Sequence, residues 1–233
     1  MFEILQNLSS EPPVPGLESL SAVVVQEQSV PTAPNETPTT RFGAIKIPMR
    51  QDPSQSCITI IELPNDDNTN DYVVYLFGGV RYSSDYYAEL TMLLKTVSAS
   101  STIEIFISSP GGSLAAGAII ADAISSSAAQ VITIACGMVA SAAALIWSYG
   151  KIRQVCDGAI LLFHMSSHMD WGNSEKIRID ADNIVRYVKE VAIDPIREQG
   201  LLTEEEAGIL IDNRKDILID ATTMRQRLEA VNV

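Results

Sequence analysis

Residues 103–148 are IEIFISSPGGSLAAGAIIADAISSSAAQVITIACGMVASAAALIWS, and their pattern indicates the fold class. This stretch begins with β-branched residues that predict a strand over Ile103–Ile107, because such side chains pack well on a pleated surface. A double-glycine turn follows, and the small and apolar residues of Leu114–Ile124 predict a helix. The order strand, turn, helix is typical of an α/β domain.

The second half of this stretch, Val131–Trp147, is apolar enough to imitate a membrane span. Its residue types favour another interpretation. They predict a strand of mainly β-branched residues over Val131–Ala135, a break at Gly137, and a buried helix over Val139–Ser148. We therefore expect no membrane segment here.

The alternation of strand and helix continues outward on both sides. The sequence predicts strands at Tyr72–Phe77 and Ala159–Phe163, and a helix capped within Ser83–Asp85 whose apolar positions are Tyr86, Leu90, Leu93, Leu94 and Val97. It also predicts a long helix from about Ser174 to before Gly200, and a capping box formed by Thr203 and Glu206. The fold class is thus α/β, with right-handed crossovers and largely parallel strands.

Proline content marks the domain boundary. The chain has 11 prolines, and most of them lie in the first 53 residues among Ser, Thr, Glu and Gln. Such a composition cannot bury enough apolar surface to order the chain. We expect a disordered N-terminal arm over residues 1–55 and one folded domain over residues 56–233.

The composition indicates which classes of partner and which cellular compartment are expected. The net charge of −13, from 29 acidic and 16 basic residues, repels phosphate backbones and anionic lipids, so nucleic-acid binding is not expected. The cysteines Cys57, Cys136 and Cys156 are odd in number and contain no CxxC pair, which fits a reducing compartment and neither a disulfide framework nor a zinc site. The N-terminus lacks a signal-peptide pattern. We therefore expect a cytoplasmic protein.

The first chemical motif is SSPGGS, residues 108–113. Two consecutive glycines between a strand and a helix let the backbone approach a ligand and direct N–H groups toward it. An ordinary strand-to-helix turn is the alternative. The motif is not a P-loop, since the GK[ST] ending is absent.

The second and third motifs each supply one reactive side chain. Ser141, in GMVASAAA, follows a strand at the start of an alanine-rich helix, where the next N–H, from Ala142, can stabilise an oxyanion. His164 ends an apolar strand, at the sheet edge where α/β folds place their chemistry. Alone, Ser141 could be a capping or buried serine and His164 a structural histidine. His168 is expected to be solvent-exposed.

Together, SSPGGS, then GMVAS, then a strand ending in FHM resemble the Clp proteolytic subunits, which have a serine-proline-glycine-glycine turn, a G-x-x-A-S nucleophile motif and a histidine base segment. The similarity runs from about Tyr72 to Ala230. It implies a ClpP/crotonase-like spiral of β-β-α units with a protruding handle helix.

The resemblance also implies roles for named residues. Ser141 would be the nucleophile and His164 its base, and Asp216 aligns with the family's third catalytic residue, with Asp220 and Asp212 as fallback candidates. The amides of Gly112 and Ala142 would form the oxyanion hole. Substrate would bind along the segment that contains Gly111, Ser113 and Leu114. No metal or organic cofactor is implied.

The family further implies a homo-oligomeric ring, a heptamer that can stack into a double ring around an enclosed chamber. Protein substrates would reach the chamber through a separate AAA+ unfoldase that hydrolyses ATP. Two departures from the family pattern are present. Lys215 replaces an arginine beside the aspartate that in the family helps two rings interlock, and a point charge cannot copy its planar fork. The usual glycine-rich stretch after the histidine is altered to residues 168–173, HMDWGN, which bears on the geometry of the handle and on substrate docking.

Other functions stay open at this stage. A signal-peptide-peptidase-like protease shares the SPGG turn but uses a lysine base and a membrane anchor. A capsid-maturation protease on the same fold differs mainly in its substrates. A crotonase-like acyl-CoA enzyme shares the spiral fold but has no use for the serine-histidine pair. A catalytically inactive ring subunit is the alternative from a different class.

Overall fold

The computed structural model describes residues 58–65, 70–82, 84–165, 174–213 and 215–231. The predicted arm, residues 1–55, lies outside the described residues, as do His168 and the altered segment 168–173.

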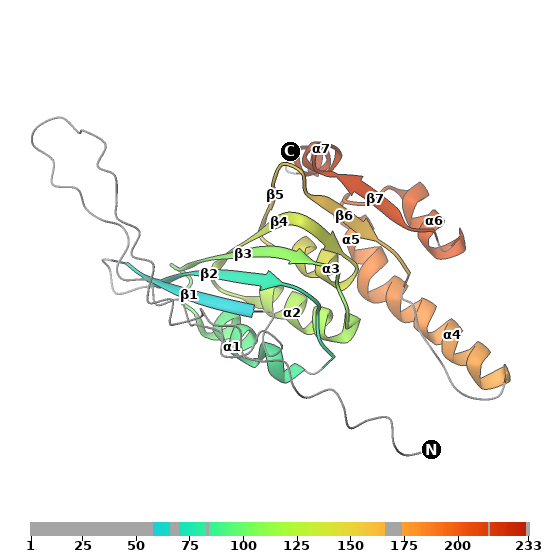
Figure 1. The fold of residues 1–233 in the computed structure, drawn as a ribbon, viewed down its shortest axis with the longest axis horizontal. Helices are drawn as coiled ribbons and strands as arrows, with labels where there is room; N and C mark the ends of the chain where they lie inside the picture. The colour runs from blue at the N-terminus through green and yellow to red at the C-terminus, as the bar shows by residue number, and fades with distance from the viewer. Residues whose placement is uncertain (1–57, 66–69, 83, 166–173, 214, 232–233) are drawn as a thin grey trace, which may run out of the picture. The chain divides into compact units, whose positions relative to one another are not determined.

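The described strands form one seven-stranded sheet (Figure 1). They are β1 Ile58–Pro64, β2 Asn70–Phe77, β3 Thr102–Ser109, β4 Gln130–Ala140, β5 Ile152–Val155, β6 Ile160–Phe163 and β7 Ile217–Asp220. The order is β1-β2-β3-β4-β6-β7, and β5 pairs with β4 beside this path. Among these strands, β1 pairs antiparallel with β2 and β7 pairs antiparallel with β6, and all the other pairs are parallel. The prediction of a largely parallel sheet is therefore confirmed.

The described helices follow β2, β3, β4, β6 and β7 along the chain. They are α1 Ala88–Thr96, α2 Leu114–Ser126, α3 Ala142–Ser148, α4 Ser174–Val188, α5 Asp194–Glu198, α6 Glu204–Asn213 and α7 Ala221–Val231, with a 3-10 turn at Ser84–Tyr87 and a π-helical turn at Lys189–Ile193. The predicted α/β class is confirmed, and α4 extends away from the sheet as the expected handle helix (Figure 1).

The prediction for the segment after Val131 was partly wrong. Gly137 does not end the strand, because β4 runs on to Ala140 and the helix begins only at Ala142. Gly137 has φ of 61° and lies in an irregularity of the β3–β4 register. Up to Ala135, β4 pairs with β5, and from Met138 onward it pairs with β6. The glycine bends the strand so that it can change partner, as a bulge does.

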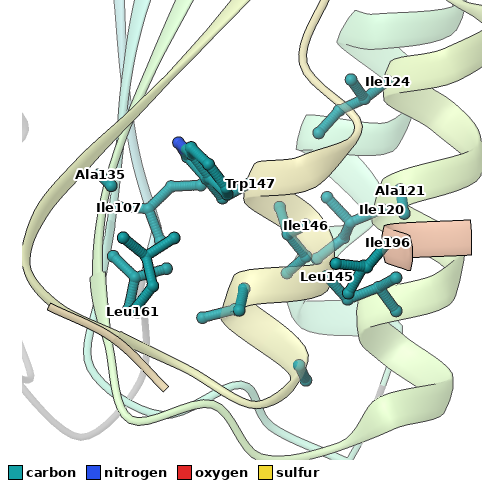
Figure 2. Packing of buried hydrophobic residues seen from close by; sticks show 14 of the residues in the cluster. Ile107, Ile120, Ala121, Ile124, Ala135, Leu145, Ile146, Trp147, Leu161 and Ile196 are labelled. Carbon is teal, nitrogen blue, oxygen red and sulfur yellow. The ribbon is translucent and has the colours of Figure 1, made fainter. Parts of the chain in front are cut away.

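Helix α3 is the centre of the core. All seven of its residues are buried. Trp147 points toward the sheet residues Ile107, Ala135 and Leu161, whereas Leu145 and Ile146 lie toward α2 and α5 (Figure 2). A helix enclosed on both sides cannot shift easily in a close-packed interior. The residue that precedes it, Ser141, is therefore held in a fixed place.

Helix starts follow local rules in one case and tertiary packing in another. The predicted capping box is confirmed: Thr203 N donates to Glu206 (2.8 Å) and Glu206 N donates to the Thr203 hydroxyl (3.2 Å). The predicted cap within Ser83–Asp85 was wrong for α1, which begins at Ala88 after the 3-10 turn. Tyr87 is buried there and its hydroxyl accepts the Arg81 N–H at 2.6 Å.

Candidate active site

The double-glycine turn is held against the segment after β2. Val80 N donates to Gly111 O and Ser113 N donates to Val80 O, both at 2.8 Å, which makes a parallel bridge between Val80 and Gly112. This bridge does not use the N–H of Gly112. With φ of 84° and 146°, Gly111 and Gly112 occupy backbone conformations that L-residues rarely adopt.

The turn also touches the start of α3. A Cβ atom at Gly111 would lie 2.4 Å from Ala140 O, 2.7 Å from Ser141 Cβ and 3.1 Å from Ala142 N. Glycine is thus needed at residue 111 for this close approach. The approach brings the first motif and the second motif together at one edge of the sheet.

Ser141 is the one described non-glycine residue with positive φ, at φ 56° and ψ −125°. Such a conformation costs about 1–3 kcal/mol and persists only when its surroundings enforce it. Here the Ser141 N–H donates to Leu162 O at 2.8 Å, and the buried helix α3 holds the other side. Strained residues of this kind concentrate at functional sites.

Ser141 and His164 line the same pocket, together with Gly112. His164 directly follows β6, and that strand pairs with the end of β4 through Ala140 and Leu162. The two reactive side chains predicted from sequence are therefore on one side of the domain and open into one cavity. Among the described residues, no hydrogen bond joins the side chains of Ser141 and His164; in catalytic sites such bonds often tighten only when substrate binds.

The remaining wall of this pocket is apolar, and most of it comes from the end of the long helical segment. It consists of Leu114, Phe163, Val188, Ala192, Ile193 and Ile196. Three of them, residues 188, 192 and 196, follow the i, i+4, i+8 spacing of one helix face. That spacing was the available signal, but the sequence did not indicate what this face would contact. The π-helical turn at Lys189–Ile193 also lies in the wall.

Asp216 lies beside His164 by strand register. In the antiparallel β6–β7 pair Phe163 faces Ile217, so the next residues outward are His164 and Asp216. Asp216 is exposed and immediately precedes β7. In the part of the chain that the structure describes, its carboxylate makes no hydrogen bond to His164.

The two fallback aspartates are placed differently. Asp220 pairs with Ile160 at the other end of β6, and its carboxylate accepts from Thr223 N and from the Thr223 hydroxyl, each at 2.9 Å. These hydrogen bonds, first the one from the backbone, hold the pKa of Asp220 below its usual value. Asp212 is exposed on α6. Neither carboxylate lines the pocket.

Of the other predicted site residues, some line the pocket and some are buried beside it. Leu114 lines the pocket, whereas Ser113 is buried, and its hydroxyl accepts the Ala116 N–H at 3.2 Å as the N-cap of α2. Ala142 is fully buried at the start of α3. No cluster of three or more His, Cys, Asp or Glu side chains suited to a metal ion occurs within the described ranges.

Comparison with family models gives a match to Clp protease over residues 73–223. This span covers well over half of the sequence. The chain belongs to the Clp protease family. A solved structure of a mutant ClpP1 from Listeria monocytogenes matches with a TM-score of 0.56 and 23% identity, over 66% of this chain and 86% of that chain. At this identity the likeness shows the shared fold, and it confirms the ClpP-like architecture expected from the motifs.

None of the curated proteins compared with the chain matches it. Within the described ranges, no helix of this Clp protease family member combines the length and the apolarity needed to cross a membrane.

Proposed function

We propose that this chain is a serine endopeptidase that cleaves unfolded polypeptides inside a ring of identical subunits. The observation that carries the proposal is the shared pocket of Ser141 and His164 beside the double-glycine turn. Membership of the Clp protease family supports the same reaction class. The ring, its feeding by an ATP-dependent AAA+ unfoldase and a cytoplasmic location are the family's pattern, and we propose them for this chain on that ground.

In the proposed reaction, Ser141 Oγ attacks the peptide carbonyl carbon while His164 takes the hydroxyl proton. His164 then gives this proton to the leaving amine, and water repeats the cycle to release the acyl group from the serine. Asp216 would accept the other ring N–H of His164, fixing its tautomer and stabilising the imidazolium. The register that brings Asp216 next to His164 supports this role.

The oxyanion of the tetrahedral intermediate would lie between the N–H groups of Gly112 and Ala142. The N–H of Gly112 is left out of the bridge to Val80, and residue 111 lies in close approach to Ala142 N. Donors fixed in this way before reaction stabilise the developing charge without reorganisation. The apolar wall of the pocket favours substrates with apolar side chains next to the cleaved bond.

An aromatic cluster on the sheet face opposite the core supports the proposal that a protein partner docks there. Tyr75 stacks on Phe106 and meets Phe77 edge to face, both with ring centroids 5.4 Å apart. Phe77 is 44% exposed, while its neighbour Leu76 is fully buried on the other face. Exposed aromatic groups of this kind are favoured contacts in protein interfaces, which fits docking of an unfoldase.

Labelling with a fluorophosphonate probe tests the enzyme proposal on the full chain. We expect the label on Ser141, its loss in Ser141→Ala and strong reduction in His164→Ala. The chain has two histidines, so His168→Ala is the matched control and should label normally. Ser100→Ala, at an exposed serine, controls for background reaction. A folded, unlabelled ring would instead identify an inactive scaffold subunit, and labelling that survives Ser141→Ala would refute the assigned nucleophile.

A further inference from the structure

Two cysteines from adjacent parallel strands meet at the point where β4 changes partner. The Sγ atoms of Cys136 and Cys156 are 3.2 Å apart. Each residue directly follows the last β4–β5 pair, Ala135 with Val155, and Cys156 N donates to Ala135 O at 2.9 Å. Both are free thiols and neither is fully buried. Backbone pairing therefore holds the two sulfurs together.

We propose that Cys136 and Cys156 are a redox site that closes reversibly into a disulfide between β4 and the end of β5, with a small-molecule disulfide such as oxidised glutathione as the oxidant. Neighbouring strands lie about 4.8 Å apart, within the Cα separation that a disulfide spans. The sulfurs must approach by about 1.2 Å to reach bonding distance. Side-chain rotation can supply such a shift without moving the strands.

The chemistry proceeds in two exchanges. The Cys156 thiolate attacks one sulfur of the small disulfide, whose S–S bond breaks to release one thiolate. Cys136 then loses its proton and attacks Cys156 Sγ, which forms the internal disulfide and releases the second thiolate. Overall the two protein thiols give up two electrons and two protons, and the small disulfide is reduced to two thiols.

Burial, and then the hydrogen bond and the charge of Cys156, raise the pKa of the Cys136 thiol to about 12. The raised pKa disfavours the Cys136 thiolate, so we assign Cys156 as the attacking thiol and Cys136 as the resolving one. In a reducing compartment such pairs form transiently and report oxidation.

The position of the pair indicates what closure would change. Beyond Cys136 lies Gly137, where β4 leaves β5 and turns to pair with β6. The disulfide would close a loop that contains Ser141 and all of α3. Cross-linking this loop restricts the unfolded chain and so stabilises the folded one. Oxidation would therefore stabilise the part of the sheet where β4 changes its partner from β5 to β6, and this part supports the pocket.

The test uses the full chain with Cys57→Ser, which leaves only these two cysteines. After treatment with oxidised glutathione, we expect both free thiols to disappear, the mass to fall by two hydrogen atoms, and non-reducing peptide mapping to find one Cys136–Cys156 linked peptide within a single chain. Dithiothreitol should restore both thiols. The midpoint of thermal unfolding should rise by several degrees on oxidation.

Single variants in the same background separate a pair from two independent thiols. Cys136→Ser should retain one bound glutathione on Cys156, because no resolving thiol remains, and its unfolding midpoint should not rise. Cys156→Ser should react with oxidised glutathione more slowly than Cys136→Ser does. Persistence of both thiols, stable glutathione adducts in the two-cysteine protein, or links only between chains would overturn the proposal. None of these readouts depends on peptidase activity, so the proposal stands or fails separately from the proposed function.

Discussion

The backbone N–H of Ser141 donates a 2.8 Å hydrogen bond to the carbonyl of Leu162, two residues before His164. This bond continues the pairing of β4 with β6 past Ala140 and into the positive-φ residue that precedes α3. The strand that positions the proposed base therefore also holds the backbone of the proposed nucleophile. Their shared pocket follows from one piece of sheet, so disturbing that sheet should disturb both.

The strained backbone of Ser141 predicts that two inactive variants at this residue differ in stability. Ser141→Gly and Ser141→Ala should both abolish peptidase activity, because each lacks the hydroxyl. Glycine tolerates φ of 56° whereas alanine does not, so Ser141→Gly should be more stable than Ser141→Ala by about 1 kcal/mol. Chemical denaturation of the two variants measures the difference. Equal stabilities would mean that the backbone relaxes at little cost.

The close approach at Gly111 predicts a substitution that damages the site. In Gly111→Ala the new Cβ would meet Ala140 O at 2.4 Å and Ser141 Cβ at 2.7 Å, so the serine must move. A displacement near 1 Å can cost about 100-fold in rate, and we expect kcat/KM to fall at least that far.

Gly158→Ala is the matched control for this change. Gly158 also has positive φ, at 75°, but a Cβ there would meet nothing within 4 Å. It should lose about 1 kcal/mol of stability and keep its activity. If both variants lose activity to the same extent, backbone strain rather than the clash with Ser141 would be the cause.

Local patterns predicted most strands and helices because their signals are contained in short stretches. Alternating burial of Ile103, Ile105 and Ile107 in β3 follows from the period of a strand, and the Thr203–Glu206 capping box is a four-residue rule. The end of β4 could not be predicted in this way. Its last residues are strand because they pair with β6, and a small-residue sequence such as Val139-Ala140 gives no local sign of that pairing.

The candidate site divides in the same manner. The places of Ser141 and His164 at element ends, together with the motif resemblance, predict them as site residues, and the structure brings both to one pocket. The wall formed by Val188, Ala192 and Ile196 depends on how a distant helix packs. The contact between Cys136 and Cys156 depends on strand register. Neither contact leaves a signal in a single sequence, and the number and spacing of the cysteines accordingly indicate only a reducing compartment.

The register beside His164 predicts different effects for two aspartates on the same strand segment. Asp216→Asn should lower kcat by about 10⁴-fold with little change in stability, since an amide favours the wrong histidine tautomer. Asp220→Asn should leave kcat unchanged, because Asp220 caps α7 and asparagine caps nearly as well. Steady-state hydrolysis of a fluorogenic peptide distinguishes them. The reverse pattern would move the third catalytic role to Asp220.

The lysine at residue 215 predicts the assembly state. Its side chain is exposed immediately before Asp216, where the family's arginine helps two rings interlock. An ammonium cannot make the paired hydrogen bonds of a guanidinium. Native mass spectrometry should find a single ring of seven 25.3 kDa chains, and Lys215→Arg should increase the share of fourteen-chain particles. A wild-type protein that is already fully fourteen-chain would contradict this prediction.

The contact between α6 and α7 predicts how the stability depends on pH. Burial raises the pKa of Glu206, but hydrogen bonds from Arg227 and Thr203 outweigh it and hold that pKa below its ordinary value of 4.5. The Arg227 guanidinium donates to both carboxylate oxygens at 2.8 Å. The stabilisation is therefore complete above pH of about 4.5 and is lost as the pH falls through the lower folded-state pKa.

Thermal unfolding of wild type and Glu206→Gln from pH 7 to pH 3 checks this dependence. Glu206→Gln should melt at a lower temperature at pH 7, and the gap should shrink in acid as the wild-type carboxylate becomes protonated. Glu205→Gln is the matched control, since Glu205 is exposed on the same helical turn. It should follow the wild-type curve throughout. A gap that stays constant with pH would mean that Glu206 contributes by packing and not through its charge.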